Sequence, residues 1–212
     1  MRFIAVIDYK MGNLLSVSKA LEASGAQVKI VTSPAEASDA SGLVLPGVGN
    51  FGEAMVHLNE SGWIPCIRKW IAEDKPFLGI CLGMQMLLES SEEAPGVPGI
   101  GIFKGSVKRF PAGIEKVPHM GWNSVRITPG NKFLSGLPED PYFYFVHSYY
   151  ASPEDPSVVA AVSDYILDFA AALSRGNLIA TQFHPEKSQN NGLHILHKFI
   201  ETTIQRQGDI RP

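Results

Sequence analysis

A single cysteine occupies the position in the sequence best suited to nucleophilic chemistry. Cys81 lies in the segment Gly-Ile-Cys-Leu-Gly at residues 79–83, directly after the apolar run 76–80. The run predicts a short buried strand and residues 82–89 predict a helix, so the thiol would lie in the sharp turn between them, a nucleophile elbow. The two glycines relieve crowding in such a turn, and the first amides of the helix favour a thiolate. The amide of Leu82, the next residue, would donate to an oxyanion.

A histidine and a glutamate later in the chain are suited to activate that thiol. His184 and Glu186 lie in Gln-Phe-His-Pro-Glu-Lys-Ser at residues 182–188, after the apolar stretch 178–181, which predicts another strand. Reactive groups of α/β proteins gather at the carboxyl ends of parallel strands. His184 can take the thiol proton and return it to a leaving amine, while Glu186 orients the imidazole. Taken alone, the Cys81 motif also fits a small buried cysteine, and the His184 motif also fits a solvated loop. The presence of both motifs favours a Cys-His-Glu triad.

Length, composition and charge exclude several classes of protein. The 212 residues fit one domain spanning 1–212. Two distant cysteines, of which Cys66 fits a small buried hydrophobe, argue against a disulfide scaffold and favour a reducing compartment, so we expect a cytoplasmic protein. No apolar run approaches the ~20 residues of a membrane span. A net charge of −3, with the charges mixed along the chain, argues against nucleic acid as a partner.

The chain alternates between strand and helix patterns up to the cysteine and changes character after it. The first part predicts strands at residues 3–8, 27–31, 42–45 and 76–80. It predicts helices at residues 13–24, 51–59 and 63–73, and a further helix that begins at residue 33. Residues 103–110, 122–127, 142–147, 157–162, 169–174 and 178–182 predict short strands, followed by a helix over 192–205. We therefore expect an α/β fold with a mostly parallel central sheet, helices on both faces and an antiparallel extension.

The two motifs together resemble the signatures of the class I (triad) glutamine amidotransferases, and the resemblance covers nearly the whole chain. It implies the flavodoxin-like fold of that class and a single amidotransferase domain. It also implies hydrolysis of L-glutamine through a glutamyl thioester on Cys81, with no cofactor. The Val48 amide would be the second oxyanion donor, and the substrate amino acid would lie against Gly49, Gln85, Glu93, Ser148 and Tyr149.

Four further segments narrow the resemblance to the glutaminase subunits of imidazole glycerol phosphate synthases. They are residues 8–13, 46–52, 118–123 (Pro-His-Met-Gly-Trp-Asn) and 144–149. Lys10 departs from the glycine usual there, whereas Met84 differs from the histidine usual in anthranilate and carbamoyl phosphate glutaminases. The implied partner is the cyclase subunit, a (β/α)₈ barrel that receives ammonia in a heterodimer. The implied interface residues are Asn13, Met120, Trp122, Asn123, Tyr144 and Lys187.

Other interpretations of the sequence remain open. The chain could serve another amidotransferase, act as a catalytically silent binding subunit, or be a free-standing glutamyl hydrolase or cysteine peptidase. Trp122 also fits a core position. His119 and His147 have no carboxylate nearby in sequence and fit packing roles. His194 and His197 share a helix face without a third ligand, so we expect no metal site.

Overall fold

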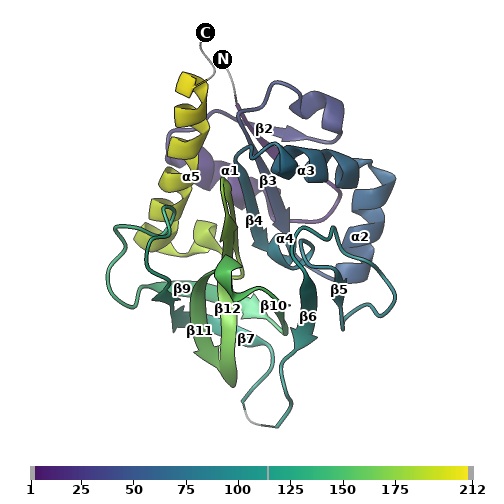
Figure 1. Cartoon of the computed structure of the whole chain (residues 1–212), viewed down its shortest axis with the longest axis vertical. Helices are drawn as coiled ribbons and strands as arrows, with labels where there is room; N and C mark the ends of the chain where they lie inside the picture. Colours follow the sequence, from purple (N-terminus) through teal and green to yellow (C-terminus); the bar gives the residue numbers. More distant parts are fainter. Residues whose placement is uncertain (1–2, 114, 210–212) are drawn as a thin grey trace.

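The backbone of the protein is organised around one eight-stranded sheet (Figure 1). The computed structural model describes residues 3–113 and 115–209. Five strands run parallel, in the spatial order β2 (Val28–Val31), β1 (Ile4–Ile7), β3 (Gly42–Gly47), β4 (Phe77–Cys81) and β13 (Leu178–Thr181). The antiparallel strands β12 (Leu167–Arg175), β11 (Val159–Tyr165) and β8 (Arg126–Ile127) extend it. The expected parallel sheet with an antiparallel extension is confirmed.

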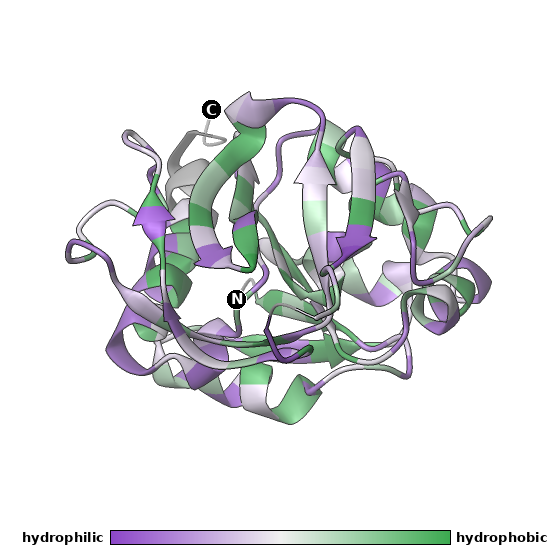
Figure 2. Ribbon diagram, turned by 90° about the horizontal axis from the view of Figure 1, so that it is seen from below, coloured by the Kyte–Doolittle hydropathy of each residue, from purple (hydrophilic) through white to green (hydrophobic). Residues whose placement is uncertain are grey.

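Helices cover both faces of the parallel strands. Alternate residues of β1 belong to two different apolar clusters: Ala5 and Ile7 to one, Ile4 and Val6 to the other. The first cluster includes residues of α2 (Phe51–Glu60) and α3 (Trp63–Ala72), and the second includes residues of α1 (Leu14–Ala23) and α5 (Gln189–Asp209). Because side chains alternate between the faces of a strand, this division means one helix pair lies on each face. Figure 2 shows the apolar residues concentrated along the strands and the hydrophilic ones on outward surfaces and loops.

Two small sheets flank the carboxyl ends of the parallel strands. One contains β10 (Tyr149–Pro153), β6 (Gly105–Arg109) and β5 (Ser90–Ser91), and the other pairs β7 (His119–Ser124) with β9 (Tyr142–His147). The antiparallel register of the second sheet sets His119 opposite His147 and Trp122 opposite Tyr144. Short 3₁₀ turns occur at η1 (Pro34–Ala37), η2 (Pro156–Val158) and η3 (Pro185–Lys187).

Three predicted elements differ from the structure. The helix expected over 82–89 is the single turn α4 (Leu82–Gln85), because the carbonyl oxygens of residues 86–88 accept hydrogen bonds from amides of residues 100–103. Backbone acceptors that are paired with a distant segment cannot continue a helix. The helix opening near residue 33 is only the 3₁₀ turn η1, and the strand expected at 122–127 is divided between β7 and β8. Strands β5 and β10 had no counterpart in the prediction.

Candidate active site

Cys81 is the last residue of β4 and has the strained backbone of a nucleophile elbow. Its φ and ψ are 54° and −109°, which a non-glycine residue adopts only when its surroundings force it. A Cβ on Gly83 would overlap the carbonyl oxygen of Leu45, and one on Gly79 would lie 3.1 Å from the Gly83 carbonyl oxygen. Both glycines therefore allow the close approach that the elbow requires, and the turn holds the Cys81 side chain at the carboxyl edge of the sheet.

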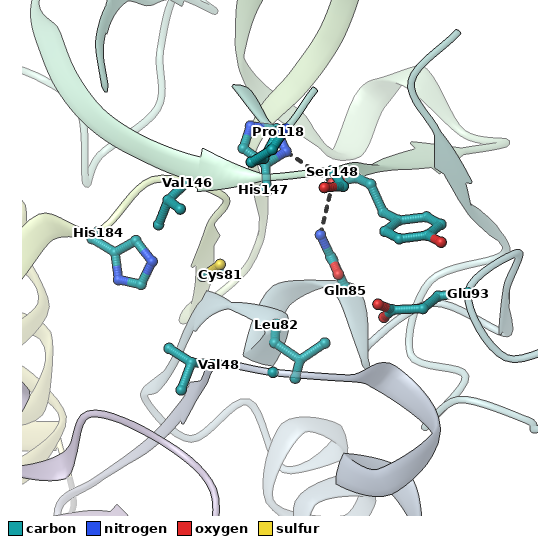
Figure 3. Close-up of a pocket in the computed structure, with 12 residues that line it drawn as sticks. Val48, Cys81, Leu82, Gln85, Glu93, Pro118, Val146, His147, Ser148 and His184 are labelled. Atoms are coloured by element: carbon teal, nitrogen blue, oxygen red, sulfur yellow. Dashed lines mark hydrogen bonds between the residues drawn. The ribbon is translucent and has the colours of Figure 1, made fainter. Parts of the chain in front are cut away.

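His184 and Glu186 form a buried pair just beyond β13. The Nδ1 atom of His184 lies 2.8 Å from Oε1 of Glu186, and both side chains are almost inaccessible to solvent. This hydrogen bond directs the other ring nitrogen, Nε2, which has no hydrogen-bond partner, toward the cavity that Cys81 also lines (Figure 3). An imidazole oriented by a carboxylate beside a thiol is arranged for proton transfer.

The surroundings of His184 favour its charged form. Burial lowers its pKa, but the interactions with Cys81 and with the Glu186 carboxylate outweigh burial and raise the pKa to about 9. A histidine charged at neutral pH next to a cysteine stabilises the thiolate, which is the attacking species. His119 and His147 show the opposite behaviour, because burial lowers their pKa values to about 4 and about 3.

A cavity of about 340 Å³ opens beside the sulfur, a size that suits a small amino acid. Its lining contains Cys81, His184 and all seven residues expected to form the oxyanion hole and the substrate site: Val48, Gly49, Leu82, Gln85, Glu93, Ser148 and Tyr149. Pro118, Val146 and His147 also line the cavity and were not expected there. In Figure 3 the sulfur lies between His184 on one side and Gln85 and Glu93 on the other.

Two polar side chains of the cavity are held by the protein itself. Gln85 donates from Nε2 to the main-chain oxygen of Tyr149 (2.8 Å) and to Oε1 of Gln182 (3.0 Å), so its own Oε1 is the atom left to accept from a ligand. Glu93 accepts from the Phe51 amide through Oε2 (2.8 Å), at the start of α2. A carboxylate and an amide oxygen lining one wall of the cavity are suited to an ammonium group.

The oxyanion donors proposed from the sequence flank the nucleophile. Gly47, at the end of β3, pairs in register with Cys81, which places Val48 beside the elbow, and Leu82 begins α4. A Cβ on Gly47 would lie 2.8 Å from the Leu82 Cβ, so the two segments are in close contact. Gly49 follows with a φ of 98°. The Val48 segment therefore has one tightly packed glycine before it and one left-handed glycine after it.

The residues expected to contact a partner differ in how much they face outward. Met120 and Trp122 are 64% and 47% exposed, so Trp122 is not a core residue. Its ring lies edge-on to Tyr144, 6.2 Å between centroids, and the Lys187 ammonium lies 5.8 Å from the Tyr144 ring. Asn13 is the N-cap residue of α1 and makes no capping hydrogen bond through its side chain. Asn123 is half-buried and donates to the Asp164 carbonyl oxygen (2.9 Å).

One polar residue that contacts the sulfur of Cys81 was not predicted from the sequence to belong to the site. Gln182, fully buried, donates from Nε2 to Sγ of Cys81 at 3.6 Å. The signal that could have found it is its position at the end of the β13 segment, two residues before His184, in the same motif.

The family model of class-I glutamine amidotransferases matches residues 5–202. The chain belongs to the class-I glutamine amidotransferases. Among its relatives in this family, the imidazole glycerol phosphate synthase subunit HisH of Moorella thermoacetica is 50% identical over 201 residues, with 95% of each chain covered. The protein of the same name from Rhodopirellula baltica is 47% identical over 203 residues, covering 95% of this chain and 98% of the relative.

Solved structures of amidotransferases share the fold. A crystal structure titled glutamine amidotransferase matches with a TM-score of 0.75 at 21% identity, covering 95% of this chain and 98% of that one. The structure of PurLQS from Thermotoga maritima matches with a TM-score of 0.75 at 20% identity, covering 98% and 100%. The fold of this class-I glutamine amidotransferase is therefore the one expected from the sequence. Within the described residues, no helix has the length and apolar character needed to cross a membrane.

Proposed function

We propose that this chain is the glutaminase subunit of an imidazole glycerol phosphate synthase. It hydrolyses glutamine and supplies the ammonia for a step of histidine biosynthesis. The observation that carries this proposal is that Cys81 and His184, the latter paired with Glu186, line one amino-acid-sized cavity in a chain about half identical to HisH subunits.

The reaction begins with attack of the Cys81 thiolate on the side-chain amide carbon of glutamine. The amides of Val48 and Leu82 stabilise the oxyanion, and His184 protonates the departing nitrogen, so that ammonia leaves and a glutamyl thioester remains. Neutral His184 then removes a proton from a water molecule that attacks the thioester. Cleavage of the carbon–sulfur bond releases glutamate and restores the thiolate and the imidazolium. Glu186 keeps Nε2 directed at the reacting atoms throughout.

The far wall of the cavity selects the amino acid part of the substrate. Oε1 of Gln85 and the carboxylate of Glu93 are placed to accept from the α-ammonium group, and the main chain at Gly49, Ser148 and Tyr149 surrounds the rest. The side chain of glutamine is then long enough to bring its amide to Cys81. The α-amino end of the substrate is then held by the far wall and its amide end lies at Cys81, which favours the attack geometry.

The exposed side chains of β7, β9 and η3 form the surface that we assign to the cyclase partner. Met120, Trp122 and Lys187 are exposed on this surface, the half-buried Tyr144 contributes its ring, and Asn13 is the N-cap residue of α1. Docking here would cover the active-site side of the chain and keep ammonia from bulk water, where it would be protonated. The partner, a (β/α)₈ barrel, would conduct the ammonia to the ribulosyl intermediate and form a heterodimer with this chain.

The test reconstitutes the chain with a cyclase subunit and compares two nitrogen sources. Cys81→Ser should abolish synthesis of imidazole glycerol phosphate from glutamine and leave synthesis from ammonium salts intact, because only ammonia production uses the thiol. Wild-type chain that supports no glutamine-dependent synthesis with the cyclase subunit, but does so with a different synthase, would show that it serves another amidotransferase.

A further inference from the structure

A pair of buried histidines beside the cavity is joined by a hydrogen bond whose direction the structure fixes. Nδ1 of His147 lies 2.8 Å from the main-chain oxygen of Tyr149, and a carbonyl oxygen only accepts, so Nδ1 carries the hydrogen. Nε2 of neutral His147 must then accept from Nδ1 of His119, 3.0 Å away. His119 Nε2 in turn accepts from Nδ2 of Asn123 at 3.3 Å. Hydrogen bonds therefore run in one direction from Asn123 to the Tyr149 carbonyl.

The same carbonyl begins a second run of hydrogen bonds that ends at the nucleophile. It also accepts from Nε2 of Gln85 (2.8 Å), as the dashed lines of Figure 3 show for both bonds. The second hydrogen on that nitrogen goes to Oε1 of Gln182 (3.0 Å). This orientation leaves Nε2 of Gln182 as the donor to Sγ of Cys81. Five side chains and one carbonyl thus connect strand β7 with the catalytic sulfur.

Burial makes this network costly unless it is fully paired. Gln182 is completely buried, and His119, His147 and Gln85 are at most 6% exposed. The ring of His119 stacks on Tyr165 and Phe145, with centroids 4.1 and 4.8 Å away, which leaves it little freedom to turn. Burial also keeps both histidines neutral by lowering their pKa values, so the direction of the hydrogen bonds is the same throughout the neutral pH range.

We propose that Gln182 stabilises the Cys81 thiolate through its Nε2 donor, and that His147 and His119 are positioning residues that hold this donor in place through the Tyr149 carbonyl and Gln85. The proposal rests on the proposed function in one respect, because it takes the Cys81 thiolate to be the nucleophile of the glutaminase reaction. It also gives strand β7, which carries the exposed Met120 and Trp122, a hydrogen-bonded connection to the sulfur.

A hydrogen bond to a charged acceptor contributes more than one to a neutral acceptor. Loss of the Gln182 donor should therefore make the thiolate less favourable while leaving His184 and Tyr9, the other titratable groups interacting with Cys81, in place. The expected loss is roughly ten- to a hundredfold in the fraction of thiolate or in the rate that depends on it. The KM for glutamine should change less than kcat, because Gln182 does not line the cavity and Gln85, which does, keeps its hydrogen bond to the Tyr149 carbonyl oxygen.

The experiment measures alkylation of Cys81 by iodoacetamide from pH 5 to 10, followed at the Cys81 peptide by mass spectrometry so that Cys66 does not contribute. Gln182→Leu removes the donor, and Gln182→Glu keeps the shape but places a carboxylate oxygen at the sulfur. His147→Leu removes the bond to Tyr149, whereas His147→Asn restores a nitrogen donor near the position of Nδ1. Ser163→Ala is the matched control, because its buried hydroxyl donates to Ser124 of β7 outside the network.

We expect both Gln182 variants to shift the alkylation profile to higher pH and to lower kcat for glutamine hydrolysis in the complex. His147→Leu should shift it in the same direction, His147→Asn should recover most of the wild-type rate, and Ser163→Ala should match wild type. A folded Gln182→Glu with the wild-type profile, or His147→Asn as impaired as His147→Leu, would overturn the proposal. Alkylation of Cys81 requires no cyclase, so the alkylation profiles test this proposal even if the proposed function proves wrong.

Discussion

The main-chain amide of His184 donates to the main-chain oxygen of Tyr144 at 3.0 Å, which ties the catalytic base to the strand that carries an exposed aromatic residue. Ser188 reinforces the connection, because its hydroxyl accepts from the Tyr144 amide (2.9 Å) and donates to the His184 carbonyl oxygen (2.7 Å). These hydrogen bonds join the backbone of β9 to that of His184. The proposed partner surface and the catalytic base share one set of hydrogen bonds.

Ser188→Ala should loosen this connection. The partly buried Tyr144 amide would lose its acceptor, which should cost about 1 kcal/mol, the low end of the range for a buried unpaired donor. We expect a lower free energy of unfolding in urea and roughly a tenfold loss in kcat for glutamine hydrolysis, since small displacements of a catalytic group are costly. Ser174→Ala, which removes a hydroxyl bonded to the Leu178 carbonyl oxygen within the sheet, is the control. Equal kcat in the two variants would contradict the assigned role of Ser188.

Removing the base should be more damaging than removing the group that orients it. We expect His184→Ala to lower glutamine-dependent kcat by about 10³-fold or more, and Glu186→Gln by a smaller factor, because the glutamate transfers no proton to substrate. Steady-state kinetics in the complex would measure both, with ammonium-dependent synthesis as the control for an intact partner. A His184→Ala variant with full glutamine turnover would refute the triad.

The elements that could be predicted from the sequence are those whose causes are local. The apolar run before Cys81 and the glycines around it establish the strand, the turn and the position of the thiol within a few residues of one another. The parallel sheet follows from the alternation of short apolar and amphipathic segments. Those features are set by side-chain periodicity and by backbone sterics, which a sequence displays directly.

The missed features depend on segments that meet only in three dimensions. Helix α4 stops after one turn because amides of residues 100–103 donate to the carbonyl oxygens of residues 86–88, which follow it, and nothing near residue 86 in the sequence indicates that. His119 and His147 were expected to fill packing roles, and their hydrogen bond exists because the β7 and β9 register sets them opposite each other. Gln182 contacts a sulfur 101 positions away in sequence.

The raised pKa of His184 predicts how its charge and its contribution to stability depend on pH. Its pKa is about 9 in the folded chain, against about 6.5 in an unfolded chain. Since the folded value is the higher one, the stabilising contribution of charged His184 is complete below about pH 6.5 and is lost as the pH rises through 9. An NMR titration should find the imidazole charged at pH 8, and Cys81→Ala should lower its pKa by removing one partner. A neutral imidazole at pH 8 in the wild-type chain would contradict this prediction.

The backbone around Val48 predicts that hydrolysis of glutamine is coupled to the partner. Val48 is 40% exposed immediately after β3, and a glycine lies on each side of it, so no flanking side chain hinders rotation of the Gly47–Val48 peptide that would donate to the oxyanion. We expect low glutaminase activity from the isolated chain and a rise when the cyclase subunit binds its own ligand. One oxyanion donor is worth roughly two to three orders of magnitude in rate. Equal turnover with and without the liganded partner would refute the coupling and leave the triad intact.

Gly49→Pro separates this coupling from thiol chemistry. Proline fixes φ near −65° and has no amide hydrogen, so it cannot adopt the backbone that Gly49 has in this structure. Glutamine hydrolysis in the complex should fall by about two orders of magnitude, because the oxyanion segment is displaced. Iodoacetamide forms no oxyanion, so it should alkylate Cys81 in this variant at a rate near that of the wild-type chain. If alkylation falls as far as hydrolysis does, the substitution has disturbed the elbow itself, and the Val48 segment is then a support for Cys81 rather than a separate switch.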